Sequence, residues 1–150
     1  ATAEINGKEV VREVNNLGEI KLADKPKLLV SIHPSDGEGT QPLTELTIAP
    51  GQTISARVSI ERNDFDGRVR FGKADSGRNL PHGVYVDNIG LNGLLIVEGQ
   101  KERMFFITAA KWVPDTSRVF HLRTTDDGIQ VSHPVILHVR NPGNVASNSD

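Results

Sequence analysis

The sequence contains no cysteine, which excludes disulfide frameworks, thiol nucleophiles and cysteine-ligated zinc or iron–sulfur sites. Aromatic residues make up only 5% of the chain, too few for the stacked platforms that bind single-stranded nucleic acid. The formal net charge is -2, so the chain as a whole does not attract nucleic acid or anionic lipid. No apolar run approaches the roughly 20 residues of a membrane-spanning helix. We therefore expect no nucleic-acid partner and no membrane insertion.

What the sequence does contain is alternation of apolar and polar residues, with almost no helical periodicity. In TISARVSIE (53–61) every second residue is apolar, and this period of two predicts a half-buried strand. The same period recurs in RVRFG (68–72), RVFHLRTT (118–125) and PVILHVR (134–140). RMFFITAA (103–110) is apolar on both faces, which predicts a central strand.

Short turn signals separate these strands. They are PGQ (50–52), FDG (65–67), LPHG (80–83), LNG (91–93), EGQ (98–100) and DDG (126–128). Asn6-Gly7, between TAEI and KEVV, predicts a further hairpin turn. Many short strands at spacings of about 8–12 residues indicate a sandwich or a barrel. The pattern predicts an all-β, immunoglobulin-like β-sandwich with an N-terminal strand extension.

The polar stretch HPSDGEGTQP (33–42) divides the chain. We predict an N-terminal β extension or hairpin over residues 1–34 that packs on the sandwich, the sandwich itself over residues 43–140, and a polar tail or linker over residues 141–150. The N-terminal part has too few apolar residues to fold alone, so it is expected to add strands to an edge of the sandwich or to cap one end.

The order of these signals over residues 43–140 resembles bacterial immunoglobulin-like modules of large exported multidomain proteins, the kind that also carry pre-peptidase C-terminal domains. The shared features are a Pro-Gly turn before an alternating strand, an aromatic-x-Gly turn before a further strand, an LP-x-Gly-Val segment, a Glu-Gly turn before an apolar strand, and a last Pro-Val-x-Leu-x-Val strand. The resemblance implies an extracytoplasmic, non-catalytic module that contacts neighbouring domains of the same polypeptide or cell-surface partners. It carries over no catalytic residues and implies no cofactor.

The segment NDFDG (63–67) admits a tight turn, a calcium loop or a pair of catalytic carboxylates. A helix-loop-helix calcium loop fails, because placing Gly67 at loop position 6 puts Arg62 and Lys73 at ligand positions. Nothing else in the segment suggests a sugar cleft for catalytic carboxylates. We expect a hairpin turn in which Phe65 lies under the loop and Gly67 takes a positive φ.

A metal site remains open as an alternative at the same segment. Asp64 and Asp66 would bind calcium there if a second loop brought Asp75 or Asp87 beside them. Carboxylate oxygens are the ligands that calcium prefers. The only cofactor that the sequence leaves open is therefore calcium.

An alternative function is carbohydrate binding, with glycans as partners. Trp112 and Tyr85 are the single residues of their kinds. An exposed tryptophan stacks on sugar rings, but a lone tryptophan in a sandwich more often packs against the core or rim, and we expect packing. Arg57, Arg68 and Arg70 are predicted to point outward on neighbouring strands and to form cross-strand charge pairs with Glu61 and nearby acidic residues. As ligand groups, Arg68 and Arg70 would instead meet an anionic glycan.

Histidine and serine positions predict no catalytic or zinc site. His133 and His138 lie five positions apart, and this odd separation places them on opposite faces of one strand. His121 and His138 would meet on one face only if their strands pair in a suitable register. Ser35 has a histidine and an aspartate near it in one polar loop, whereas the groups of a triad converge from separate segments. We therefore predict that the chain is not an enzyme.

Overall fold

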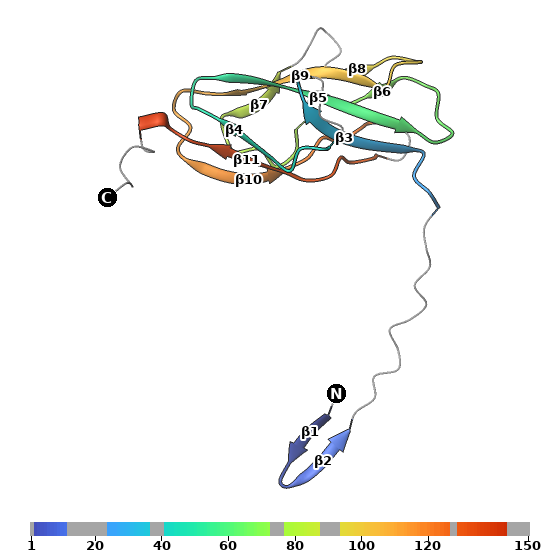
Figure 1. The fold of residues 1–150 in the computed structure, drawn as a ribbon, viewed down its shortest axis with the longest axis vertical. Helices are drawn as coiled ribbons and strands as arrows, with labels where there is room; N and C mark the ends of the chain where they lie inside the picture. Colours follow the sequence, from blue (N-terminus) through green and yellow to red (C-terminus); the bar gives the residue numbers. More distant parts are fainter. Residues whose placement is uncertain are drawn as a thin grey trace.

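The computed structural model describes residues 2–11, 24–36, 41–72, 77–87, 94–126 and 129–143, and these form an all-β structure (Figure 1). The strands are β1 (Thr2–Ile5), β2 (Lys8–Val11), β3 (Leu28–Pro34), β4 (Glu45–Ile48), β5 (Thr53–Arg62), β6 (Val69–Arg70), β7 (Val84–Asp87), β8 (Leu95–Ile96), β9 (Glu102–Ala109), β10 (Thr116–Phe120) and β11 (Val135–Val139). No helix in the described part of the chain is long and apolar enough to cross a membrane.

The larger sheet has four antiparallel strands in the order β3-β5-β9-β7. The alternation predicted for TISARVSIE is confirmed in β5, where Ala56, Val58 and Ile60 are buried. The central position predicted for RMFFITAA is also confirmed, because β9 lies between β5 and β7. Its outer face is not buried, however, and Met104 is 46% exposed. An antiparallel sheet can leave one face in solvent, and this sheet does so at Met104.

The smaller sheet has three strands in the order β10-β11-β4. β10 and β11 are antiparallel, whereas β4 runs parallel to β11. Leu137 and Val139 of β11 are buried and Ile136 is exposed, as the period of two predicts. Figure 1 shows this sheet and the four-stranded sheet as two stacked layers.

The core lies between the two layers and is filled by aliphatic side chains and phenylalanines. Phe71, Phe105 and Phe120 are its largest fully buried residues. They come from chain segments that are far apart in the sequence, so the core joins the two sheets. Burying a side chain of this size contributes about 1.5–3 kcal/mol, so the core dominates the stability of the fold.

The Asn6-Gly7 hairpin is confirmed: both residues have positive φ, 54° and 71°, and Ile5 pairs with Lys8 across the turn. All of β1 and β2 is exposed. That the hairpin packs on the sheets stays a prediction. Residues 28–34, which the sequence places in the N-terminal extension, form β3, the edge strand of the four-stranded sheet.

The NDFDG segment is not a hairpin turn. β5 pairs with β3 and β9, whereas β6 pairs with β8, so the strands on either side of the segment are not partners. Phe65 lies beside Gly67 of the same loop, as predicted, and also packs against the core. The positive φ, 66°, falls on Asp64 and not on Gly67. The prediction failed because β6 pairs with β8, a strand later in the chain, and not with β5.

Arg62 holds this loop in place. Its Nη1 donates to the carbonyl oxygens of Phe65 and Gly67, at 3.1 and 2.6 Å. Its Nη2 donates to those of Val97 and Gln100, both at 3.2 Å. One guanidinium therefore joins the β5–β6 loop to the turn before β9.

Candidate functional site

Trp112 is 61% exposed, so it does not pack into the core; its ring lies at the surface against Gly83 and His82, which agrees only with the rim packing expected as the other possibility. The residue that follows it, Val113, takes the inward position and is 3% exposed. Two adjacent turns position the indole of Trp112 at the surface. In one, Val84 N donates to Pro81 O at 3.0 Å, and in the other Val113 N donates to Ala110 O at 3.2 Å.

The two turns are held together. Ala110 N donates to the carbonyl of Gly83 at 2.9 Å. Gly83 has a φ of +84°, which suits the third position of a type II turn and favours glycine there. The LPHG turn is thus confirmed. The ring of His82 lies 5.1 Å from that of Trp112, tilted by 50°. These contacts fix the indole while leaving much of its surface in solvent.

A surface hollow of about 300 Å³ opens beside the indole. It is lined by Pro81, His82, Trp112, Val113, Pro114, Thr116 and Arg118. The walls are mainly apolar, with one hydroxyl and one guanidinium from β10. Such a surface offers a flat apolar face together with a few polar groups, which is the usual make-up of a small-ligand site.

The structure does not bring the other predicted ligand residues to this hollow. Tyr85 is 52% exposed on β7, where it pairs with Thr108 and does not line the hollow. Arg68 is exposed beside a separate hollow of about 240 Å³ that also includes Glu98. Of the four predicted residues, only Trp112 belongs to the candidate site.

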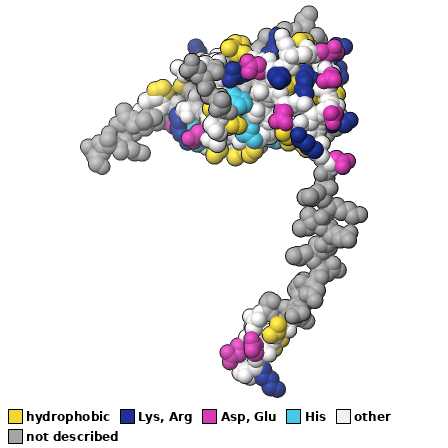
Figure 2. Space-filling view, turned by 45° about the vertical axis from the view of Figure 1, so that its right-hand side comes forward, with side chains coloured by type: hydrophobic (Ala, Val, Ile, Leu, Met, Phe, Trp, Pro, Cys, Tyr) yellow, Lys and Arg dark blue, Asp and Glu magenta, His cyan; other side chains and the backbone are white. Residues whose placement is uncertain are grey.

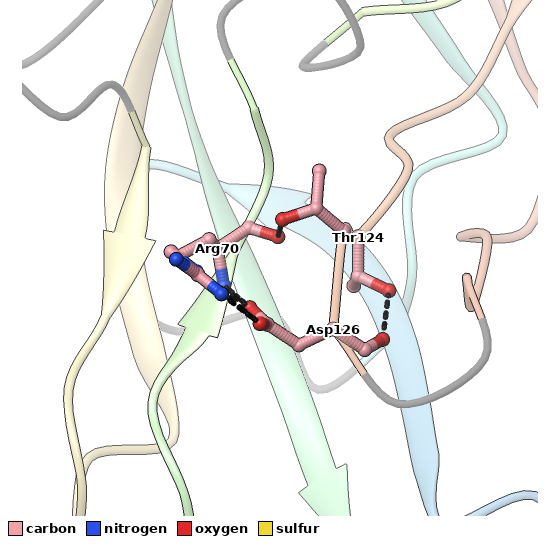
Figure 3. Close-up of polar contacts among 4 residues, drawn as sticks. Arg70, Thr124 and Asp126 are labelled. Atoms are coloured by element: carbon pink, nitrogen blue, oxygen red, sulfur yellow. Dashed lines mark hydrogen bonds and ion pairs between the residues drawn. The ribbon is translucent and has the colours of Figure 1, made fainter.

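Arg70 is engaged in an ion pair (Figure 3). Its Nη2 lies 2.6 Å from Oδ1 of Asp126, and its backbone N donates to Oδ2 at 2.7 Å. Thr125 N donates to the carbonyl of Arg70 at 2.8 Å, and Thr124 Oγ1 donates to the carbonyl of Asp126 at 3.1 Å. Hydrogen bonding from Arg70 lowers the pKa of Asp126, against a smaller opposing effect of burial. Arg70 therefore fastens β6 to the segment after β10.

The predicted charge pairs are partly different from those observed. Arg57 Nε lies 3.5 Å from Glu102 Oε2 on the neighbouring strand β9. Glu61 instead pairs with Lys25, at 3.8 Å. On the face shown in Figure 2, basic and acidic side chains are interspersed rather than gathered into a patch of one sign.

The calcium site stays a prediction. Asp64 and Asp66 are both exposed in the loop after β5. Asp75 and the side chain of Asp87, its proposed further ligands, lie outside the described residues. Within the part that is described, no three histidine or acidic side chains gather closely enough to hold a metal ion.

The structure also contains a polar cluster that was not predicted from the sequence. On the outer face of the three-stranded sheet, Ser117 Oγ lies 2.8 Å from His138 Nδ1, and His138 Nε2 lies 3.2 Å from Glu45 Oε2. Arg140 Nη2 donates to Ser117 Oγ at 2.7 Å. The register pairs His138 with Ser117, four residues before His121, so the two histidines do not meet. The cluster forms only because β10, β11 and β4, which are distant in the sequence, pair in one sheet. No local sequence motif predicts it.

No protein-family model matches the chain, and no curated protein matches it. Among solved structures, it is similar to a family 123 glycoside hydrolase from Clostridium perfringens that was studied for glycolipid glycan hydrolysis. The identity is 12% and the TM-score 0.47, over 77% of this chain and 27% of the hydrolase chain. The chain thus spans little more than a quarter of that structure, and a likeness this distant carries no argument about function.

Proposed function

We propose that this chain is a non-catalytic, immunoglobulin-like interaction module of a larger exported bacterial protein. The sheet order supports the immunoglobulin-like part. In that fold the first sheet runs A-B-E-D and the second contains C, F and G. The order β3-β5-β9-β7 fits the first sheet, and the pair β10-β11 fits strands F and G. An assignment of β6 to strand C is supported by the hydrogen bond that Thr125, just beyond β10, donates to the Arg70 carbonyl.

The hydrogen bonding of Ser117 supports a module without catalysis. A nucleophilic serine needs a free oxygen lone pair and a base that takes its proton. Here Arg140 donates to Ser117 Oγ, and its Nη2 also lies 3.2 Å from His138 Nδ1. The guanidinium therefore occupies one of the two lone pairs of Ser117 Oγ and competes for the Nδ1 lone pair that would take the proton. These contacts favour a role in joining β10, β11 and β4.

The observation that carries the interaction role is the exposure of Trp112. Leaving an indole in water forfeits the free energy that its burial would supply, and exposed aromatic anchors are typical of binding surfaces. A carbohydrate ligand is the second candidate function, and the same residue favours it. Trp112 sits in a hollow with a hydroxyl and a guanidinium, which together suit a sugar ring.

A glycan array probed with the wild type, Trp112→Ala and Tyr85→Ala tests these functions. Carbohydrate binding predicts glycan signals that Trp112→Ala loses and Tyr85→Ala keeps, because Tyr85 lies outside the hollow. Absence of any signal would remove the carbohydrate candidate and leave a protein contact. Hydrolysis of p-nitrophenyl acetate or p-nitrophenyl glycosides above background, if lost in Ser117→Ala, would overturn the non-catalytic proposal.

A further inference from the structure

We infer that the Trp112 hollow binds an acidic sugar, a uronate residue of a polysaccharide, and that Arg118 recognises its carboxylate. This inference rests on the carbohydrate-binding function proposed above. It adds Arg118, which the sequence did not single out, to the ligand-binding residues. It also assigns the ligand to a chemical class.

Arg118 reaches the hollow because of its position on β10. Thr116 and Arg118 are two residues apart, so their side chains leave the strand on the same side. Both line the hollow, whereas Ser117 between them joins the cluster on the outer face. The strand thus places a hydroxyl and a guanidinium side by side next to the indole.

Arg118 differs from three other arginines of the fold in having its donors available. The guanidinium of Arg62 donates its hydrogen bonds to backbone carbonyls, and that of Arg70 donates to Asp126. The guanidinium of Arg140 donates to Ser117 and to nearby carbonyls. Within the described residues, no carboxylate pairs with Arg118. An exposed guanidinium presents a planar fork of donors that matches a carboxylate in a bidentate arrangement.

The neighbours of Arg118 favour a sugar over a flexible acidic peptide. Trp112 offers a broad apolar face, and Pro81 and Pro114 extend the apolar wall. A pyranose ring has one face of C–H groups that packs on an indole, while its edge carries polar groups. A uronate adds a carboxylate at that edge, where Arg118 and Thr116 lie. A peptide carboxylate brings no such ring.

The hollow is preformed. Trp112 is held by Gly83 and His82, and the two turns that carry these residues are hydrogen-bonded to each other. A rigid aromatic anchor loses little conformational entropy when a ligand binds. Binding therefore depends on the side chains already in place.

The test is a calorimetric titration with uronate oligosaccharides: oligogalacturonate, oligomannuronate and oligomers containing glucuronate. Each is paired with its carboxyl-reduced, neutral counterpart. We expect at least one acidic oligomer to bind about tenfold more tightly than its neutral partner, the size of one charge-assisted contact. Arg118→Gln should remove that difference, and Trp112→Ala should remove binding of both forms. Arg68→Gln, an equal charge change at another hollow, should change neither.

The outcomes separate this inference from the function on which it rests. If acidic and neutral oligomers bind equally and Arg118→Gln has no effect, the acidic class is wrong while carbohydrate binding stands. If no oligosaccharide binds, in this titration or on the glycan array, both are wrong. If an oligoglutamate peptide binds as tightly as the best uronate and depends on Arg118, the ligand is an acidic peptide and the sugar assignment is overturned.

Discussion

The indole of Trp112 lies against the backbone of Gly83, so that a Cβ added to Gly83 would stand 2.5 Å from Cη2 and 2.8 Å from Cζ2 of the ring. Real Cβ atoms do not approach other atoms so closely. The conformation of this glycine and the position of the exposed indole therefore depend on each other.

Gly83→Ala is expected to destabilise the fold and to displace Trp112. The positive φ alone costs an L-residue about 1–2 kcal/mol, and relieving the clash requires the ring to move. Urea denaturation measures the first effect. Iodide quenching measures the second, because Trp112 is the only tryptophan and its fluorescence reports this hollow alone.

Gly99→Ala is the matched control for that variant. Gly99 also has a positive φ, +75°, but no atom lies within 4 Å of the added Cβ. Gly99→Ala should lose only the free energy of unfolding that the positive φ accounts for, while the quenching of Trp112 stays that of the wild type. Equal quenching in both variants would show that Gly83 does not position the indole.

Arg62→Lys is expected to lower the free energy of unfolding by about 2 kcal/mol. A lysine offers one compact ammonium and cannot donate to carbonyls of both loops, so part-buried and exposed carbonyl acceptors lose charged donors. Urea denaturation checks this, with Arg68→Lys as the control because Arg68 is exposed. Equal stability of the two variants would contradict the role given to Arg62.

The Arg70–Asp126 ion pair predicts how stability depends on pH. Because the pKa of Asp126 is lower in the folded state than its unfolded value of about 3.9, the pair stabilises the fold fully above that pH. The contribution disappears as the pH falls through the folded pKa. Asp126→Asn should therefore cost at most about 1 kcal/mol at neutral pH, because the Asp126 side chain is only 13% exposed but the Arg70 side chain is 56% exposed and solvent screens the pair.

Urea denaturation from pH 7 to pH 2 checks this prediction. The difference between wild type and Asp126→Asn should be constant down to about pH 4 and then shrink. A difference that does not change over the whole range would mean that the charge of Asp126 does not stabilise the fold.

Deleting residues 1–23 is expected to leave the thermal unfolding midpoint of the remaining domain unchanged. Every strand residue of the β1–β2 hairpin is exposed, and Glu4 lies directly opposite Glu9, which disfavours the hairpin itself. Calorimetry of the full chain and of the deletion variant measures this midpoint. Burial of Ile5 or Val10 on the sheets would contribute about 1.5–3 kcal/mol. A fall of several degrees would then support the packing predicted from the sequence.

Local sequence patterns were enough to predict the strands and several of the turns. The inward positions of Val58 and Leu137 follow from a period of two, and the turn at Asn6-Gly7 follows from backbone preferences of two residues. Both depend on neighbours in the sequence. For that reason the all-β class could be predicted from single segments.

The candidate site could not be predicted in this way, because it depends on contacts between distant segments. Trp112, Gly83 and Arg118 come together only after β7, β9 and β10 have packed. The β6–β8 pairing likewise overrode the hairpin expected at NDFDG. The exposed indole was missed because the sequence does not show that Val113 takes the inward place.

The most direct measurement of the central claim combines binding and turnover in one experiment. The protein is titrated with the uronate oligosaccharides while Trp112 fluorescence is followed, and the ligand is then recovered and its mass determined. We predict saturable binding that Trp112→Ala abolishes, with the recovered ligand intact. Absence of saturable binding would contradict carbohydrate binding through this hollow, and a cleaved ligand would contradict a non-catalytic module.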